Sequence, residues 1–247
     1  MPAQTAFEVA PSLAAFEVLQ LGTDGREGNG TGARSLQFGH VADTTFGPDG
    51  TVYSSDGDGG SANRVVGVSV PQQGFTSRPP LWRFDWATTP KLPATRYNNP
   101  HSLTYHAPSG LLVVCDRDNN ATRLLRAADG ADMGTLDCGL DFGGTAGKPF
   151  GVRSLQLGSH DLLFLALMDN PQDGAHQEIV VLNASSLSAA AGGVGRIQRC
   201  DVIQRITVDP SELSGPHLLG VDPATGDLYA ALVADSPRST VLRYTLA

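Results

Sequence analysis

Short apolar runs alternate with turn residues along the chain, in a pattern typical of strands rather than helices. A first apolar strand leads into a Pro/Gly turn, and a second, nearly all-apolar strand follows. The turns occupy residues 47–50 (Gly-Pro-Asp-Gly), 107–110 (Ala-Pro-Ser-Gly) and 222–226 (Asp-Pro-Ala-Thr-Gly). Proline presets the first turn dihedral and glycine adopts the positive one, so these segments predict hairpins. The apolar second strand indicates packing on both of its faces.

The hairpin belongs to a unit that occurs four times. Aligning the units on Val41, His101, Phe150 and His217 gives spacings of 101−41 = 60, 150−101 = 49 and 217−150 = 67 residues. A third strand is expected in each unit, and three of these strands carry an Arg whose charged end should extend from a sheet edge into solvent. The expected third strands are 64–70, 122–127, 178–182 and 241–246.

These units predict an all-β fold, a β-propeller with four detectable blades in a single domain over residues 1–247. The 29 Gly, 16 Pro and 17% charged residues fit many turns and few helix surfaces. The fourth unit lacks an outer strand, and residues 15–22 are predicted to supply it and close the last blade. Propellers have about four to eight blades. The ring is therefore small, or incomplete, or contains divergent blades.

Charge and cysteine content narrow the classes of function. A net charge of −8 without a Lys/Arg cluster excludes a nucleic-acid groove. The three cysteines, Cys115, Cys138 and Cys200, are odd in number and irregularly spaced. They predict neither a disulfide framework nor a CxxC metal site, and are expected to be buried, idle thiols.

No apolar run approaches the roughly 18 residues of a membrane span. Residues 1–22 show no signal-peptide pattern. Three glycosylation sequons begin at Asn29, Asn120 and Asn183, which favours a secreted or extracellular glycoprotein.

Two segments of the second unit carry a resemblance to a known family. Residues 99–103 (Asn-Pro-His-Ser-Leu) followed by 115–119 (Cys-Asp-Arg-Asp-Asn) look like an NHL repeat. More narrowly, they resemble the peptidyl-hydroxyglycine alpha-amidating lyase. Three further segments occur in that family's order. They are Ser-Asp-Gly at 55–57 in the unit before, the segment 149–168 in the unit after, and Pro-His at 216–217 in the last unit. The resemblance covers roughly residues 15–247.

The resemblance implies a six-bladed propeller with zinc held by three His, one from each of three blades. His101 and His217 match two of these ligands, and Arg117 matches the active-site arginine. Zinc with an open position polarises a hydroxyl or carboxylate, and an adjacent Arg grips a carboxylate. Such a site would release peptide amide and glyoxylate.

The chain also departs from the family pattern. No residue matches the third His: His40 falls one position off the ligand register, where Val41 aligns. Asp58 follows Ser-Asp-Gly where the family's tyrosine is expected, and Leu218 replaces the Asp that would bind calcium. The family's first two blades have no counterpart. The implied zinc site is incomplete and calcium is doubtful.

A structural role competes with each of these chemical roles. His101 and His217 would bond backbone near the axis, and Arg117 would pair with a neighbouring Asp. Asp56 and Asp116 each lie six residues after a turn glycine and are expected to bond backbone at a strand end. His106 and His176 are expected to be exposed loop residues.

Two functions from different classes remain. One is a binding scaffold that meets a peptide or protein ligand at the propeller face, with a degenerate lyase-like site. The other is a zinc-dependent peptidyl-hydroxyglycine amidating lyase. Sugar or lactone hydrolysis, a third class, needs a ring of carboxylate ligands that the sequence does not supply.

Overall fold

The structure, a computed structural model, describes residues 38–58, 62–69, 83–88, 97–142, 147–168, 177–188, 196–208, 214–234 and 240–245. Within these residues the regular elements are sixteen strands and one 3-10 helix, η4 (Arg117–Asn119). The predicted all-β class is confirmed. The predicted closing strand at 15–22 and His176 lie outside the described residues.

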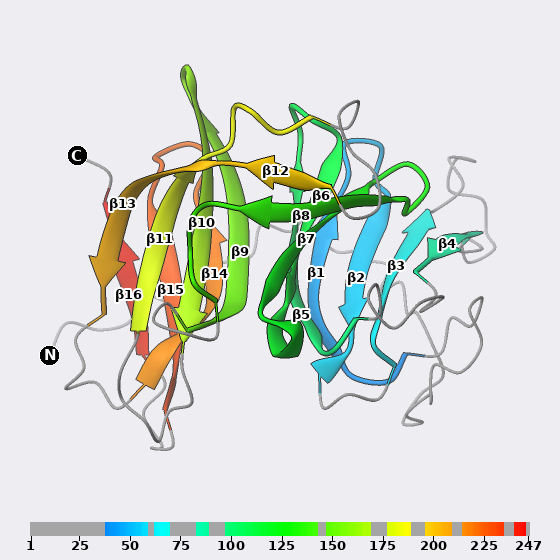
Figure 1. Cartoon of the computed structure of the whole chain (residues 1–247), viewed down its shortest axis with the longest axis horizontal. Coiled ribbons are helices and arrows are strands. Elements are labelled where there is room, and N and C mark those ends of the chain that lie inside the picture. Colours follow the sequence, from blue (N-terminus) through cyan, green and yellow to red (C-terminus); the bar gives the residue numbers. More distant parts are fainter. Residues whose placement is uncertain are drawn as a thin grey trace, which may run out of the picture.

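The strands form four sheets, one for each predicted unit, and these sheets are the blades of a propeller (Figure 1). Blade 1 contains β1 (Val41–Phe46), β2 (Val52–Asp56), β3 (Arg64–Ser69) and β4 (Arg83–Ala87). Blade 2 contains β5 (Pro100–His106), β6 (Leu111–Asp116), β7 (Ala121–Arg126) and β8 (Asp132–Asp137), with β12 (Ile197–Arg199) added at its edge. Blade 3 contains β9 (Lys148–Leu157), β10 (His160–Met168), β11 (Gln177–Asn183) and β13 (Asp201–Thr207), and blade 4 contains β14 (Ser214–Val221), β15 (Leu228–Ala234) and β16 (Thr240–Tyr244).

The blades radiate from a shared centre, which we call the hub. Each blade has its first strand innermost, and β1, β5, β9 and β14 pack side by side in chain order. The hairpins form at the predicted turns, with positive φ at Gly50, Gly110 and Gly226. The repeat therefore sets both the local turns and the radial order of the blades.

The core lies between the blades, as the apolar second strands predict. Along β6, Leu111 and Val113 face blade 3, whereas Leu112 and Val114 face blade 1. The whole of β6 is buried, because a blade lies on each side. Fully burying one such side chain contributes about 1.5–3 kcal/mol, so contacts between blades dominate the stability of the fold.

The Arg residues of the third strands do not all behave as expected. The Nε atom of Arg64 donates to Asp56 at 2.9 Å, and Arg64 is only 3% exposed. In blade 2, Arg123 of β7 pairs in the same way with the buried Asp116 of β6. The prediction of solvent-reaching side chains is wrong for these two. An Asp at the end of the second strand lies beside the third strand and draws the guanidinium inward.

These two Asp residues have the backbone role that the sequence indicates. Asp56 accepts a hydrogen bond from the Gly39 amide, and Asp116 accepts one from the Asn98 amide, each at 2.8 Å. Burial raises the pKa of both carboxyl groups, while these bonds and the Arg partners act in the opposite direction.

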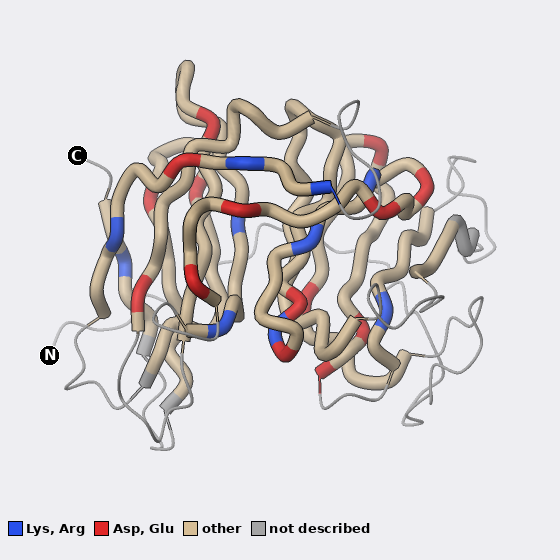
Figure 2. The backbone as a smooth tube through the Cα atoms, in the orientation of Figure 1, with Lys and Arg blue, Asp and Glu red and all other residues tan. Residues whose placement is uncertain are grey.

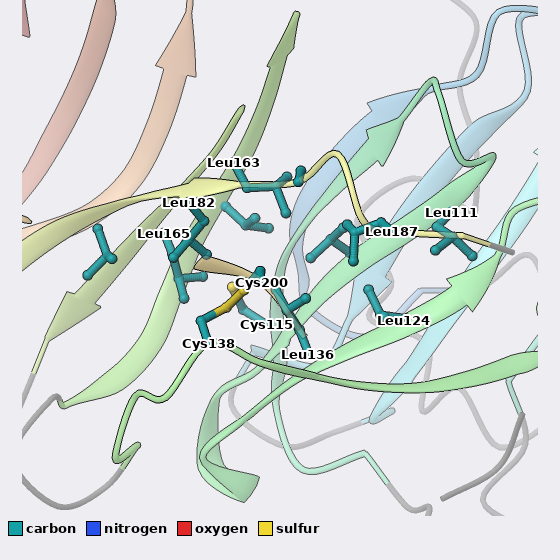
Figure 3. Packing of buried hydrophobic residues seen from close by; sticks show 14 of the residues in the cluster. Leu111, Cys115, Leu124, Leu136, Cys138, Leu163, Leu165, Leu182, Leu187 and Cys200 are labelled. Carbon is teal, nitrogen blue, oxygen red and sulfur yellow. A yellow bond between two sulfur atoms is a disulfide. The ribbon is translucent and has the colours of Figure 1, made fainter. Parts of the chain in front are cut away.

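The cysteines correct another prediction. Cys138 and Cys200 form a disulfide with Cα atoms 4.7 Å apart, inside the cluster between blades 2 and 3 (Figure 3). Their separation of 62 residues gives no sign of this pairing. Cys115 is a free, fully buried thiol, as expected, and burial raises its pKa well above the usual value.

A polar network joins three innermost strands. Arg153 on β9 reaches both carboxylate oxygens of Asp43 on β1, at 2.7 and 3.0 Å. Ser102 on β5 donates to the same carboxylate at 2.6 Å and accepts from the Val152 amide at 3.1 Å. Blades 1, 2 and 3 are thereby fixed in register close to the hub.

Replacing Asp43 with Asn is expected to lower the free energy of unfolding by roughly 2–3 kcal/mol, because it leaves Arg153 without its anion in a largely buried site. Urea unfolding measures the effect. Arg126→Ala is the matched control, since its pair with Asp129 lies on an exposed turn and should contribute little. Equal losses in the two variants would refute the special role of the network.

Candidate functional site

Each innermost strand carries a β-bulge near its beginning. The pairing skips one residue in each: Ala42 in β1, His101 in β5, Phe150 in β9 and His217 in β14. A bulge leaves one residue outside the ladder and re-aims its side chain. The bulges also correct the alignment of the units. Ala42, not Val41, is equivalent to His101 and His217, so His40 lies two positions from the ligand register.

Three of the bulge side chains meet at the hub. The ring centroids of His101 and His217 are 4.5 Å apart and the rings stand edge to face. The Phe150 ring lies 5.2 Å from His101 and 5.5 Å from His217. The two prolyl-histidine segments, 116 residues apart by 217−101, thus share one centre, as the radial arrangement requires.

A backbone hydrogen bond fixes the tautomer of His101. Its Nδ1 lies 2.8 Å from the carbonyl oxygen of Phe150, and His101 is 1% exposed. A carbonyl only accepts, so Nδ1 carries the proton and Nε2 of the neutral ring presents a lone pair. The bond is the backbone contact expected of a structural role. It also leaves Nε2 suited to accept a hydrogen bond or to bind a metal.

Both imidazoles are neutral at pH 7. Burial lowers the pKa of His101. Burial and then the neighbouring His101 lower the pKa of His217 to about 4, although Asp58 acts in the opposite direction. Two adjacent rings cannot both take a proton without repulsion in a partly desolvated site. The two histidines therefore offer neutral acceptor groups rather than cations.

Arg117 lies beside this cluster because η4 begins directly after β6. Its guanidinium stands over the Phe150 ring at 5.0 Å. Its Nε donates to Asp118 at 3.3 Å, and its Nη1 lies 3.8 Å from Asp58. Lys148 and the Asn99 side chain also bond Asp118, at 3.2 and 3.1 Å. Arg117 therefore forms the ion pair expected of a structural role, and its guanidinium also lies against a hub side chain, Phe150.

A metal ion at the hub would need more ligands than the two histidines. Among the residues that the structure describes, no three His, Cys, Asp or Glu side chains gather closely enough to hold a metal ion. A catalytic zinc site takes three protein ligands and one open position. His101 and His217 provide two imidazoles, and no third ligand joins them within the described ranges.

A second histidine site, with His106 as its single histidine, lies at the hairpin turn of blade 2. His106 is fully buried, so its predicted exposure is wrong. Its Nδ1 lies 2.6 Å from Ser109 Oγ, and its Nε2 lies 2.9 Å from Asp161 Oδ1 of blade 3. The fully enclosed ring has no access to a substrate. The Ser–His–Asp chain instead clamps the turn of blade 2 to blade 3.

Comparison with known proteins identifies the repeat. The chain is 34% identical over 214 residues to NHL repeat-containing protein 3 of Mus musculus and 33% identical to that of Homo sapiens. The aligned region covers 85% of this chain and 51% of each relative. The chain is a β-propeller of the NHL-repeat type. It spans about half the length of these curated relatives, and no protein-family model matches it.

Solved structures share the arrangement of blades. Hydrazine synthase of Kuenenia stuttgartiensis superposes with a TM-score of 0.53 at 15% identity, over 83% of this propeller and 46% of that chain. A putative 6-phosphogluconolactonase from Bacteroides uniformis gives 0.52 at 15% identity, over 82% and 50%. At this identity the likeness concerns the fold alone.

Lys and Arg positions are scattered among Asp and Glu positions in the part of the propeller that is described (Figure 2). In that same part, no helix has the length and apolarity to cross a membrane.

The two hub histidines predict a pH dependence of stability. Their folded pKa values lie below the ordinary value of 6.5, so the unfolded chain binds more protons as the pH falls below that value. Stability should be complete above about pH 6.5 and fall steadily toward pH 4. His217→Gln should flatten this fall in urea unfolding. His160→Gln, which removes an exposed imidazole at the β9–β10 turn, should not; equal flattening would refute the assignment.

Proposed function

We propose that this NHL propeller is a binding scaffold that takes a peptide or protein ligand at the hub end bearing His101, Phe150 and His217. The observation that carries the proposal is the convergence of three bulged residues from three blades. Bulges recur next to functional sites because they re-aim side chains. Rigid sheets that present loops and strand ends at one face are a common basis for recognition.

The chemistry of the hub suits a polypeptide. Phe150 supplies apolar surface, the partly exposed His217 supplies a neutral imidazole, and Arg117 supplies donors from a guanidinium stacked on the Phe150 ring. Aromatic and Arg side chains are enriched where protein partners bind. In this proposal the lyase-like residues form a degenerate site that binds without catalysis.

A displayed peptide library tests this function. The purified propeller should enrich a set of peptides, and His217→Ala and Arg117→Ala should each weaken the selected peptide by roughly tenfold or more, as expected for central contact residues. Arg126→Ala, on the exposed blade 2 turn, should bind as the unaltered chain does. If the selected peptides bound the unaltered chain and all three variants equally, the ligand would lie away from the hub and the proposal would be contradicted.

A zinc-dependent amidating lyase is the second candidate, favoured by the closeness of the two imidazoles. The Phe150 carbonyl would orient His101 with Nε2 toward the ion, an outer contact of the kind that metal-binding histidines usually have. Arg117 would bind the carboxylate of a peptidyl hydroxyglycine if it left Asp118. Zinc, when bound, would supply a Lewis acid. A third ligand would have to come from outside the described residues.

Metal content separates the two candidates. A lyase should retain about one zinc per chain after dialysis, lose it in His101→Ala, and release glyoxylate from a peptidyl hydroxyglycine. Elemental analysis and a glyoxylate assay measure these outcomes. A metal-free chain that releases no glyoxylate after zinc loading would end the lyase hypothesis and leave the binding scaffold intact.

We also propose that the chain is a secreted or extracellular glycoprotein. Disulfides persist mainly in oxidising compartments, and the Cys138–Cys200 bond adds to the three sequons. Two sequon asparagines lie at strand ends, Asn183 as the last residue of β11 and Asn120 immediately before β7. A mobility shift on removal of N-glycans from the protein made in a secretory host tests this, and its absence would contradict glycosylation.

A further inference from the structure

Blade 4 has one buried side and one open side. Leu228, Ala230 and Leu232 of β15 point toward blade 3 and are buried in the cluster between the two blades. The residues between them alternate to the opposite side of the sheet. That side, which we call the free face, also contains their cross-strand neighbours on β14 and β16. The side chains of the free face are Leu218, Tyr229, Ala231, Val233, Val241 and Arg243.

The equivalent side of blade 2 shows how the repeat normally treats such a surface. Leu111, Val113 and Leu124 point toward the next blade, and each is 0% exposed. On the free face, by contrast, Val233 is 40% exposed and Val241 is 64% exposed. Apolar side chains at the same place in the repeat are therefore buried in blade 2 and open in blade 4. A continuous open apolar surface marks a place where another surface docks.

Blade 1 of the same chain does not cover the free face. In the part of the chain that is described, no strand of blade 4 packs against blade 1 in the way that successive blades pack. Val66 and Val68 of β3 lie on the side of blade 1 that points away from blade 2, and they are only 0% and 2% exposed. This side of blade 1 is already covered, so it is not available to a blade 4 of either its own chain or a second one.

The charges on the free face are balanced. Arg243 is the one charged side chain among those that form it, and its Nε donates to Asp227 Oδ2 at 2.9 Å, with Nη2 donating to the same oxygen. Asp227 is itself buried. Because the guanidinium is neutralised within its own chain, two copies of this face meet without the repulsion that unpaired like charges would cause.

We propose that the free face is a dimer interface and that its occupant is the free face of a second copy of this chain. A twofold dimer needs only one patch that is complementary to itself. The free face meets that condition because it is apolar and balanced in charge. A head-to-tail contact that continued the ring would need an open side on blade 1, and that side is buried. The dimer thus extends to a second chain the face-to-face packing that joins the blades within one chain.

The mass of the full chain in solution tests the proposal. Sedimentation velocity should give a dimer of 2 × 25.8 = 51.6 kDa. The mass should not rise further with concentration, because a twofold contact uses the same patch on both copies and leaves none open. The dimer should also persist at high salt, because salt screens charges but does not weaken the burial of apolar surface.

Substitutions on the free face locate the contact. Val241→Lys should weaken dimerisation by roughly tenfold or more, because it places an ammonium group within an apolar interface. Val233→Lys repeats the test on a neighbouring strand. Phe46→Lys is the matched control, since Phe46 is 67% exposed on blade 1, and this variant should remain a dimer. All three sites are exposed, so circular dichroism should show that each variant keeps the fold of the unaltered chain.

Three results would overturn the proposal. A mass of 25.8 kDa at every concentration, or assemblies that keep growing with concentration, would exclude a closed dimer. A dimer that survives both Val233→Lys and Val241→Lys would place the contact elsewhere. Equal dissociation of Phe46→Lys would show that the free face has no special role. None of these results bears on peptide binding at the hub, so this proposal and the proposed function fail independently.

Discussion

The bidentate pair of Asp43 and Arg153, with Ser102 between them, is the contact on which the arrangement of blades most depends. One carboxylate receives donors from β5 and β9 while belonging to β1. Apolar contacts between blades are large but tolerate sliding, because dispersion and hydrophobic forces have little direction. A carboxylate held by donors in fixed positions does not tolerate such sliding. The network therefore sets the register in which the apolar faces pack.

The candidate site follows from that register. With β1, β5 and β9 aligned, the bulges fall at equivalent positions and their side chains converge. His101 gains a carbonyl from the next blade, and His217 gains a second imidazole as its neighbour. The neutrality of both rings is a consequence of this crowding and burial. Ala42 at the equivalent position of blade 1 leaves that blade without a hub side chain of comparable size.

The propeller is thus tied together in two different ways. Near the hub, a polar network joins the innermost strands of three blades. At the opposite edge of blade 2, the Cys138–Cys200 bond and β12 join the outer strand of that blade to blade 3. His106 adds a third tie through Asp161. Blades 2 and 3 therefore share inner, turn and outer contacts, and their interface contains the largest apolar cluster described.

The sequence by itself determined the hairpins, the second and third strands, the radial repeat and the backbone role of Asp56 and Asp116. These features depend on residues close in the chain, where turn chemistry and apolar alternation act locally. The repeat also pointed to His101 and His217 as neighbours, because equivalent positions of a radial repeat must meet at the centre, and the family resemblance added Arg117. The outer strands β4, β8 and β13 were not detected, since edge strands bury little and have weaker patterns.

Only the tertiary structure decided which distant groups became partners. The bulge register moved the equivalent of His101 from Val41 to Ala42, because a bulge changes pairing without changing residue type. The enclosure of His106 and the disulfide of Cys138 both depend on strands brought together from elsewhere in the chain. The spacing of residues along a sequence predicts local backbone conformation. It does not predict the distance between two side chains that meet only when the blades pack.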